Sequence, residues 1–551
     1  MSSMEQQINI LIGDIRVSPN ATDDQITEQA KKEMKRAGVS VSSLHFRLYK
    51  KSIDARKQDT IRLVCTVLVQ PTEPLSQSVI SRISSLPGVR VCSKETLSLS
   101  QGTLPLTRRP LIVGMGPAGL FCALLLAENG YAPILIDRGD CVADRVRAVE
   151  NFITRGTLDT DSNIQFGAGG AGTFSDGKLV TRISDARCDY VLTRLHEFGA
   201  PEDILVKAKP HIGTDVLRVV VDRILERIQA CGGQVLYRTR MDGVTEHSDG
   251  TLTVTTSKGD FVCGALVLAL GHSARDTYQM LISRQFAIVP KPMSVGVRIE
   301  HLQEDIDRAL YGKYAGHPSL GPAEYTLSDT KGERGVYTFC MCPGGQVVAA
   351  ASEEGGVVVN GMSYHARDGK NANCAVAVSV SPSEYGAVDG NAALGAIAYQ
   401  RNIERAAFAV GGRDYSAPVQ TLGDFMDDVV KHEPSRVLPT YRNGEHICVA
   451  NLAQVLPHDV VTSLRYGLAS FDRKIKGFAA PDAVLTAPET RTSAPVRILR
   501  GEDYAALGHE RIYPCGEGAG YAGGITSAAV DGLKIAQAIV AKYAPPINQM
   551  D

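Results

Sequence analysis

Three glycines, Gly114, Gly116 and Gly119, share the spacing Gly-x-Gly-x-x-Gly and give the strongest chemical signal in the sequence. An apolar run at residues 111–113 precedes them, and residues 120–128 follow without a helix breaker. In such a strand–turn–helix unit, the first glycine allows the tight turn and the third lets the helix pack closely on the strand. The second lets a pyrophosphate approach the backbone at a helix N-terminus that favours anions. The spacing therefore predicts a dinucleotide site.

A carboxylate strengthens this interpretation. A second apolar run at residues 134–136 ends on Asp137, which is placed to accept hydrogen bonds from a ribose. A glycine fingerprint alone is weak evidence, and a glycine-rich turn in a structural α/β unit is the alternative. The preceding strand, the following helix and the carboxylate together favour the nucleotide.

A second glycine-rich stretch occupies residues 163–180. So many glycines disfavour regular helix or strand, because ordering them costs backbone entropy. No apolar strand precedes the stretch, so a second nucleotide fold is rejected. We expect a loop that contacts a flavin, with a glycine hinge as the alternative. Its candidate contacts are Gly170, Gly172, Thr173, Ser175 and Lys178, and Arg145 or Arg147 in the helical segment before it could reach the pyrophosphate.

In two later segments, an apolar run again leads into glycines. The apolar run at residues 261–270 passes Ala269 and ends in Gly271 and His272, as a chain does when it passes close under a cofactor. Residues 511–543 begin with a short strand, pass Gly516 and Glu517, and enter a helix at Gly524 and Ile525. Glu517 can accept from a ribityl hydroxyl. The helix N-terminus can stabilise negative charge on a reduced flavin ring.

Candidate reacting groups are fewer. His272 is expected to be a general acid or base near neutral pH, with a structural histidine as the alternative. Cys340 and Cys342, at positions i and i+2 of a predicted strand, should point the same way. They could form a redox pair, or one could be a nucleophile. The alternative is two small apolar residues on one face of a strand. No cysteine or histidine spacing predicts a metal site.

The elements that must position these residues predict an α/β protein of several domains. A length of 551 residues is too great for one core. Residues 1–105 read as a β-α-β-β-α-β, ferredoxin-like α+β domain. Residues 106–290 and 481–551 read as a discontinuous Rossmann-like FAD-binding domain, and residues 291–480 as an inserted β-rich substrate or cap domain.

Composition narrows the functional classes. A net charge of −2 argues against general attraction to nucleic acid or membranes. No apolar run is long enough to span a bilayer. Residues 1–7 show no secretory signal. The 12 cysteines sit mostly singly in apolar stretches, which suits free thiols in a reducing cytoplasm.

Segments 111–138, 265–273 and 511–530 resemble, in order and spacing, the flavoproteins with two dinucleotide-binding domains. Three loops, together with the N-terminal extension, look more narrowly like the uncharacterised bacterial FAD-dependent dehydrogenases. These loops are residues 166–179, 270–276 and 337–346. The resemblance implies FAD, with its pyrophosphate at the first glycine fingerprint and its adenosine ribose on Asp137. By the same resemblance, Pro117 and Ala118 lie in the fingerprint turn, Arg138 flanks the adenine, Met241 presents a backbone group to it, and Glu517 binds ribityl or pyrophosphate oxygens.

We therefore expect a cytoplasmic FAD-dependent oxidoreductase that moves a hydride between flavin and a small organic substrate. A second complete fingerprint for a nicotinamide cofactor is missing, so NADH or NADPH would be a transient donor. One alternative is a flavin enzyme that acts on RNA or another macromolecule, read by the N-terminal domain. The other is a non-catalytic flavin redox sensor. The sequence predicts neither the substrate nor the oligomeric state.

Overall fold

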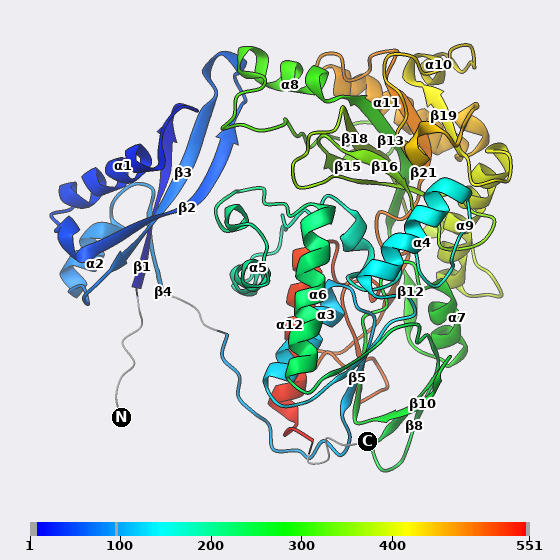
Figure 1. Ribbon diagram of the computed structural model, residues 1–551, viewed down its shortest axis with the longest axis horizontal. Coiled ribbons are helices and arrows are strands. Elements are labelled where there is room, and N and C mark those ends of the chain that lie inside the picture. Colours follow the sequence, from blue (N-terminus) through cyan, green and yellow to red (C-terminus); the bar gives the residue numbers. More distant parts are fainter. Residues whose placement is uncertain (1–7, 94–96, 547–551) are drawn as a thin grey trace.

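The computed structural model describes residues 8–93 and 97–546 and is a mixed α/β protein with parallel and antiparallel sheets (Figure 1). Residues 1–7, where the sequence predicts no secretory signal, lie outside this part. No helix within residues 8–93 and 97–546 is both long and apolar enough to cross a membrane.

The N-terminal region forms one antiparallel sheet in the order β2-β3-β1-β4. Helix α1 begins at a capping box, in which the Thr22 side chain accepts from the Gln25 amide and the Gln25 side chain accepts from the Thr22 amide. Helix α1 buries Ile26 and Met34 in the core. The elements are β1 (Ile8–Val17), α1 (Asp23–Arg36), β2 (Leu44–Asp54), β3 (Arg62–Pro71), α2 (Gln77–Ser84) and β4 (Val89–Ser93).

The dinucleotide fingerprint belongs to a parallel sheet in the order β23-β11-β5-β6-β7. Its strands are β5 (Pro110–Val113), β6 (Ile134–Ile136), β7 (Gln234–Leu236), β11 (Ala265–Leu268) and β23 (Ile512–Pro514). Strands β5, β6, β11 and β23 are buried on both faces, which is why they read as continuous apolar runs, whereas the edge strand β7 is only partly buried.

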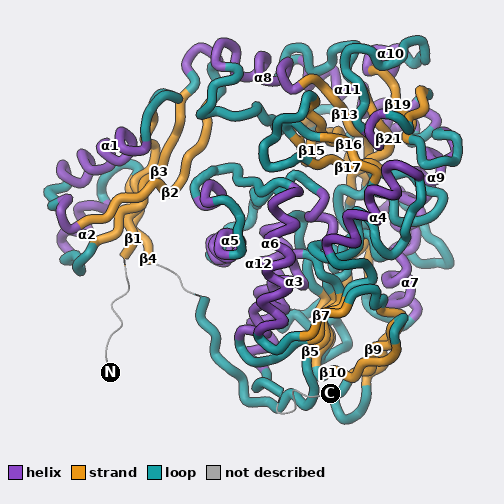
Figure 2. Tube along the Cα trace, in the orientation of Figure 1, coloured by secondary structure: helices purple, strands orange, loops and turns teal. Residues whose placement is uncertain are grey.

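Helices cover one face of this sheet. Ile112 packs among α3 (Pro117–Glu128), α6 (Thr214–Ala230) and α12 (Ile525–Lys542), and Figure 2 shows these helices lying together. The opposite face, with Leu111, packs on a small antiparallel sheet and on α7 (Arg275–Ser283). That small sheet contains β8 (Met241–Glu246), β9 (Leu252–Thr256) and β10 (Gly259–Cys263). Helices α4 (Val142–Arg155) and α5 (Arg187–Glu197) flank the layer.

A larger sheet has the order β14-β15-β18-β13-β21-β19-β20. Its strands are β13 (Met293–Leu302), β14 (Ser328–Asp329), β15 (Val336–Cys342), β18 (Asn371–Val380), β19 (Ala417–Thr421), β20 (Ile447–Val449) and β21 (Val484–Glu489). Its helices are α8 (Gln303–Tyr311), α9 (Ala392–Val410), α10 (Leu422–Asp427) and α11 (His458–Asp472). Two short ribbons accompany it, β12 (Ile288–Pro290) with β22 (Val496–Ile498), and β16 (Gln346–Ala349) with β17 (Val359–Met362).

The position of β21 corrects one predicted boundary. We placed residues 481–551 with the nucleotide domain, but β21 pairs with β13 and β19 inside the larger sheet. A short apolar run carries no mark of which sheet it joins, so only its tertiary pairing decides.

The N-terminal region docks on both other parts. The Lys51 amide donates to the Val206 carbonyl at 2.8 Å, and the Ala208 amide donates to the Lys51 carbonyl at 2.9 Å. The Gln58 side chain donates to the Ala309 carbonyl of α8. Figure 1 shows the β2–β3 hairpin reaching toward α8. The hairpin therefore bridges the two larger parts.

Candidate functional site

The fingerprint turn between β5 and α3 is built so that only glycine fits at two positions. Gly114 has φ 106°, and a Cβ there would lie 2.1 Å from the Ala269 carbonyl oxygen. A Cβ at Gly119 would lie 1.9 Å from the Gly114 carbonyl oxygen. Gly116 differs, because the nearest heavy atom to a Cβ there is the Gly170 Cα at 3.9 Å. Its missing side chain leaves open space at the N-terminus of α3.

The second glycine-rich stretch lies over this turn, in the short 3₁₀ helix η3 (Gly170–Phe174). The Gly169 amide donates to the Met115 carbonyl at 2.9 Å. A Cβ at Gly170 would lie 2.8 Å from the Gly116 Cα, and one at Gly172 would lie 3.2 Å from the Ile525 side chain. The structure thus brings three predicted segments together around Gly116.

The C-terminal segment completes the arrangement. A Cβ at Gly516 would lie 2.6 Å from the Ala118 Cβ, and one at Gly518 would lie 2.4 Å from the Gly271 carbonyl oxygen. At Gly271, Gly523 and Gly524, no heavy atom of the described chain beyond sequence neighbours lies within 4 Å of such a Cβ. Bare backbone from three segments therefore meets at the start of α3 and α12. A flat, anionic dinucleotide such as FAD fits this cradle, because such a ligand needs close backbone approach and free N–H groups.

At the adenosine end, Asp137 is 7% exposed. One of its oxygens accepts from the Met115 amide at 2.8 Å, and the other accepts from the Gly139 amide at 2.8 Å. Each carboxylate oxygen keeps a further lone pair, so a ribose hydroxyl can still donate. The Arg138 guanidinium lies 4.4 Å from the Phe166 ring centroid, beside a cavity of about 370 Å³ that Phe166 also lines.

The remaining predicted adenine contact is Met241, the first residue of β8. Its side chain is buried in the core between the parallel sheet and the small antiparallel sheet. Any contact with a ligand would therefore come from its backbone.

Several predicted ligands instead hold the glycine-rich loop in place. Arg145 is fully buried and donates to the main-chain carbonyls of residues 163, 164, 167 and 168. Thr173 donates to the Ala168 carbonyl at 3.2 Å, and Ser175 donates to the Gly172 carbonyl at 2.7 Å. These groups shape the loop, so a direct contact from Arg145 to the pyrophosphate is not part of our proposal.

Glu517 precedes α12 in the third segment. Burial raises the pKa of its carboxyl to about 7, although Lys291 acts in the opposite direction. A carboxyl in this range can accept or donate a hydrogen bond near neutral pH.

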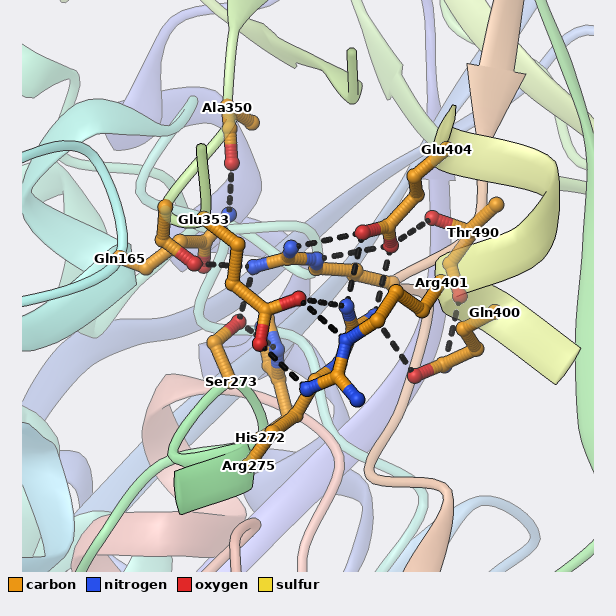
Figure 3. Close-up of polar contacts among 12 residues, drawn as sticks. Gln165, His272, Ser273, Arg275, Ala350, Glu353, Gln400, Arg401, Glu404 and Thr490 are labelled. Atoms are coloured by element: carbon orange, nitrogen blue, oxygen red, sulfur yellow. Dashed lines mark hydrogen bonds and ion pairs between the residues drawn. The ribbon is translucent and has the colours of Figure 1, made fainter. Parts of the chain in front are cut away.

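An ion network joins the segment after β11 to the larger sheet (Figure 3). Buried Arg275 donates to Glu404 at 2.7 Å and to Glu353 at 2.8 Å. Buried Arg491 donates to Glu404 at 2.9 Å. Burial alone would raise the pKa of Glu404, but Arg275 and Arg491 hold it well below its usual range. The cofactor segment is thereby fixed to α9.

His272 lies beside this network, with its Nδ1 2.9 Å from the Ser273 hydroxyl. Burial, together with Arg491 and Arg275, lowers the pKa of His272 to about 3. The expectation of a group that titrates near neutral pH therefore does not fit His272.

A second polar cluster lies where the glycine-rich loop meets the larger sheet. Asp176 is fully buried and accepts from Lys178 at 2.6 Å and from Arg367 at 2.5 Å. Burial would raise the pKa of Asp176, but Lys178 and Arg367 lower it to about 2. Lys178 also lies 3.7 Å from Glu324. The Lys178 ammonium therefore lies at the end of the glycine-rich loop, on the side of the larger sheet.

Cys340 and Cys342 lie across from this cluster, at the end of β15. Cys342 is buried and Cys340 is half-buried. The strand is irregular between Phe339 and Cys342, so the simple alternation that we expected does not hold there.

The sequence interpretation missed Glu404, Arg491, Asp176 and Arg367. Glu404 sits between the apolar residues of an amphipathic helix, which is a weak signal for a buried charge. Its partners come from distant segments, and nothing local to the sequence pairs them. Within residues 8–93 and 97–546, no group of three or more histidine, cysteine or acidic side chains could hold a metal ion.

Comparison with known proteins agrees with this geometry. Residues 292–492 match the family model described as FAD-dependent protein, C-terminal domain-like, and residues 9–70 match a domain of unknown function. An uncharacterised protein of Clostridium beijerinckii is 46% identical over 528 residues, which is 95% of this chain and 98% of that protein. The chain belongs to this FAD-dependent family. Its cofactor is accordingly FAD, as the family resemblance implied, and the protein is a flavoprotein.

Solved structures are more distant. CtdE in complex with FAD is 11% identical, with a TM-score of 0.30 over 78% of this chain and 84% of that chain. NikD, an amino acid oxidase, is 13% identical, with a TM-score of 0.32 over 80% of this chain and 96% of that chain.

Proposed function

We propose that this flavoprotein is an oxidoreductase that passes a hydride between FAD and a small organic substrate. The observation that supports this most is the glycine cradle, in which bare backbone of Gly116, Gly271 and Gly524 meets at the N-termini of α3 and α12. When bound there, FAD supplies two-electron chemistry, while the protein supplies position and electrostatics.

Different residues of the cradle bind different parts of the cofactor. Gly114, Gly116 and Gly119 let the pyrophosphate lie against the N-terminus of α3, whose free N–H groups stabilise its charge. Asp137 accepts from the adenosine ribose, and Glu517 lies on the ribityl side. The N-terminus of α12, beginning at Ile525, stabilises negative charge on the reduced ring.

The substrate side is the boundary between the parallel sheet and the larger sheet. We assign residues 106–290 and the C-terminal segment to the FAD-binding part, and the larger sheet to the substrate or cap part. Lys178 can orient a carboxylate, carbonyl or phosphate group there, because its ammonium is half-buried beside Asp176. NADH or NADPH is a transient electron donor in this proposal.

Anaerobic spectrophotometry of the purified FAD-loaded protein tests this function. We expect NADH, NADPH or one member of a panel of small organic acids, amines and alcohols to bleach the flavin band. The reduced flavin should then be reoxidised, with turnover, by a small organic acceptor. A flavin that none of these donors reduces, and that after chemical reduction passes electrons to none of the organic acceptors, contradicts the proposal.

A further inference from the structure

Strand β15 is distorted at Cys340. Phe339 pairs with Ala375 and Cys342 pairs with Asn373, so β15 has one residue more than its partner between these pairs. Cys340 has φ 46°, a region that a residue with a side chain adopts at a cost. Bulges of this kind redirect a side chain and are frequent beside functional sites. The distortion therefore marks Cys340 as a candidate functional residue.

Two cations border this cysteine pair. The Arg298 guanidinium, fully buried on β13, lies 3.8 Å from the Cys342 sulfur and also donates to the Cys340 carbonyl. Arg298 shares its charge with Glu489, 3.1 Å away on β21. Lys178, on the glycine-rich loop, is the second cation, and its charge favours the ionised form of Cys340. Positive charge thus reaches the two sulfurs from both parts of the molecule.

A buried polar atom without a partner lies at the same place. Within the described chain, the Asn373 Nδ2 has no hydrogen-bond acceptor, although Asn373 is fully buried opposite Cys342. A buried donor left unpaired is costly and is rare in folded proteins. It marks a place where a carbonyl or another acceptor of a ligand would be stabilised.

The charges around Cys340 favour its ionised form. The Cys342 thiol, which donates to the Cys340 carbonyl at 3.3 Å, is the first of the neighbours that lower the pKa of Cys340, and Arg298 and Lys178 follow it, against the effect of burial. The pKa of Cys342 is raised well above its usual value, so this residue stays a thiol donor. Asp176 opposes the ionisation, and so do Glu489 and Cys374 whenever they carry negative charge. The cations and the donor outweigh them.

From this geometry we propose that Cys340 is a nucleophilic thiolate whose site takes an α,β-unsaturated carbonyl compound. The proposal deepens the proposed function, on which it rests for placing substrate at this boundary. Cys342 is a positioning residue, because its thiol donates to the Cys340 carbonyl and so helps to hold the distorted backbone of Cys340. The unpaired Asn373 amide is the candidate donor to the carbonyl oxygen.

The covalent step balances without a further reactant other than water. The Cys340 sulfur forms a bond to the β-carbon, and the electron pair of the carbon–carbon double bond moves toward the carbonyl oxygen. The α-carbon then takes one proton from water, and hydroxide is released. No electrons are gained or lost overall, so this step is separate from hydride transfer.

Labelling of the full-length, FAD-loaded protein with N-ethylmaleimide, itself an α,β-unsaturated carbonyl compound, tests the proposal. The labelling rate of each cysteine is measured by mass spectrometry from pH 5 to pH 8. Cys188, a half-buried thiol on α5 whose pKa is raised by burial, is the internal control. We expect the rate at Cys340 to rise and then level off within this range, because its pKa is lowered, while the rate at Cys188, whose pKa is raised, keeps rising to the end of the range.

Two variants connect the midpoint to its cause. Cys342→Ala removes the neighbouring thiol that lowers the pKa of Cys340 and should raise the midpoint at Cys340 by about one pH unit or more. Lys178→Met should also raise it, and circular dichroism verifies that each variant is folded. A wild-type Cys340 that stays unlabelled, or whose rate follows that of Cys188 across the range, overturns the proposal. Labelling needs no flavin turnover, so its failure is distinguishable from failure of the flavin reduction assay.

Discussion

Glu404 holds two buried arginines at the junction between the sheets. Its charge should therefore contribute more to the free energy of unfolding than the charge of a surface carboxylate. Glu404→Gln leaves Arg275 and Arg491 without their shared carboxylate. Loss of one partner from a buried ion pair costs about 3–5 kcal/mol. We expect a loss of that order in the free energy of unfolding at pH 7, measured by urea denaturation.

The pH dependence of stability gives a second measurement on the same variant. The pKa of Glu404 is lowered in the folded protein, so its contribution is fully present above the unfolded value of about 4.3 and declines as the pH falls below it. The difference between wild type and Glu404→Gln should therefore shrink on acidification. Glu354→Gln, at an exposed position, is the control. Equal losses for the two variants would refute the buried role of Glu404.

Single residues could be predicted where one local pattern determines the chemistry. Gly114 and Gly119 were placed correctly at the turn because their spacing follows from the contact between strand and helix. His272 was interpreted wrongly as a group that titrates near neutral pH, because its pKa depends on burial and on Arg491, more than 200 positions away in the chain. The charge environment of a side chain is a tertiary property.

Helices α3 and α12 hold the cradle as a unit, because both begin at it. A Cβ at Gly532 would lie 2.1 Å from the Ala118 carbonyl oxygen, which belongs to backbone that cannot yield easily. Gly532→Ala should push the helices apart, at a cost of about 1–3 kcal/mol in unfolding free energy. FAD affinity, measured by fluorescence quenching, should fall as well.

The control for this prediction lies on the same helix. Ala541→Ser changes an exposed position of α12 and should leave both quantities nearly unchanged. If Gly532→Ala is as stable as Ala541→Ser and binds FAD equally well, close packing of α3 on α12 does not hold the cradle.

Helices and strands could be predicted where a long periodic pattern or a continuous apolar run lies next to glycines. Helix α12 and strands β5 and β6 follow from sustained apolar patterns and glycine stops. The bulge at Cys340 was not foreseen, because one extra residue in a strand leaves the composition of the segment unchanged. The sheet to which β21 belongs was also misjudged, since its apolar run would suit either sheet.

The N-terminal region should behave as a docked part of the whole molecule. The Lys51 and Ala208 amides take part in backbone hydrogen bonds that join it to the rest of the chain. Hydrogen exchange followed by mass spectrometry should show protection at both positions. The exposed turn at residues 248–249, between β8 and β9, is the internal reference. Exchange at Lys51 and Ala208 as fast as at this turn would contradict the docking.

FAD titration of Gly116→Ala tests the central claim, that bare backbone at the start of α3 holds the cofactor. Gly116 has φ −73°, and a Cβ there meets nothing closer than 3.9 Å, so alanine should fold normally. Gly13→Ala, where a Cβ makes only ordinary contacts, is the matched control. We expect wild-type melting temperatures for both variants and FAD binding weakened about tenfold or more only in Gly116→Ala. Wild-type FAD affinity in a folded Gly116→Ala protein would contradict this claim.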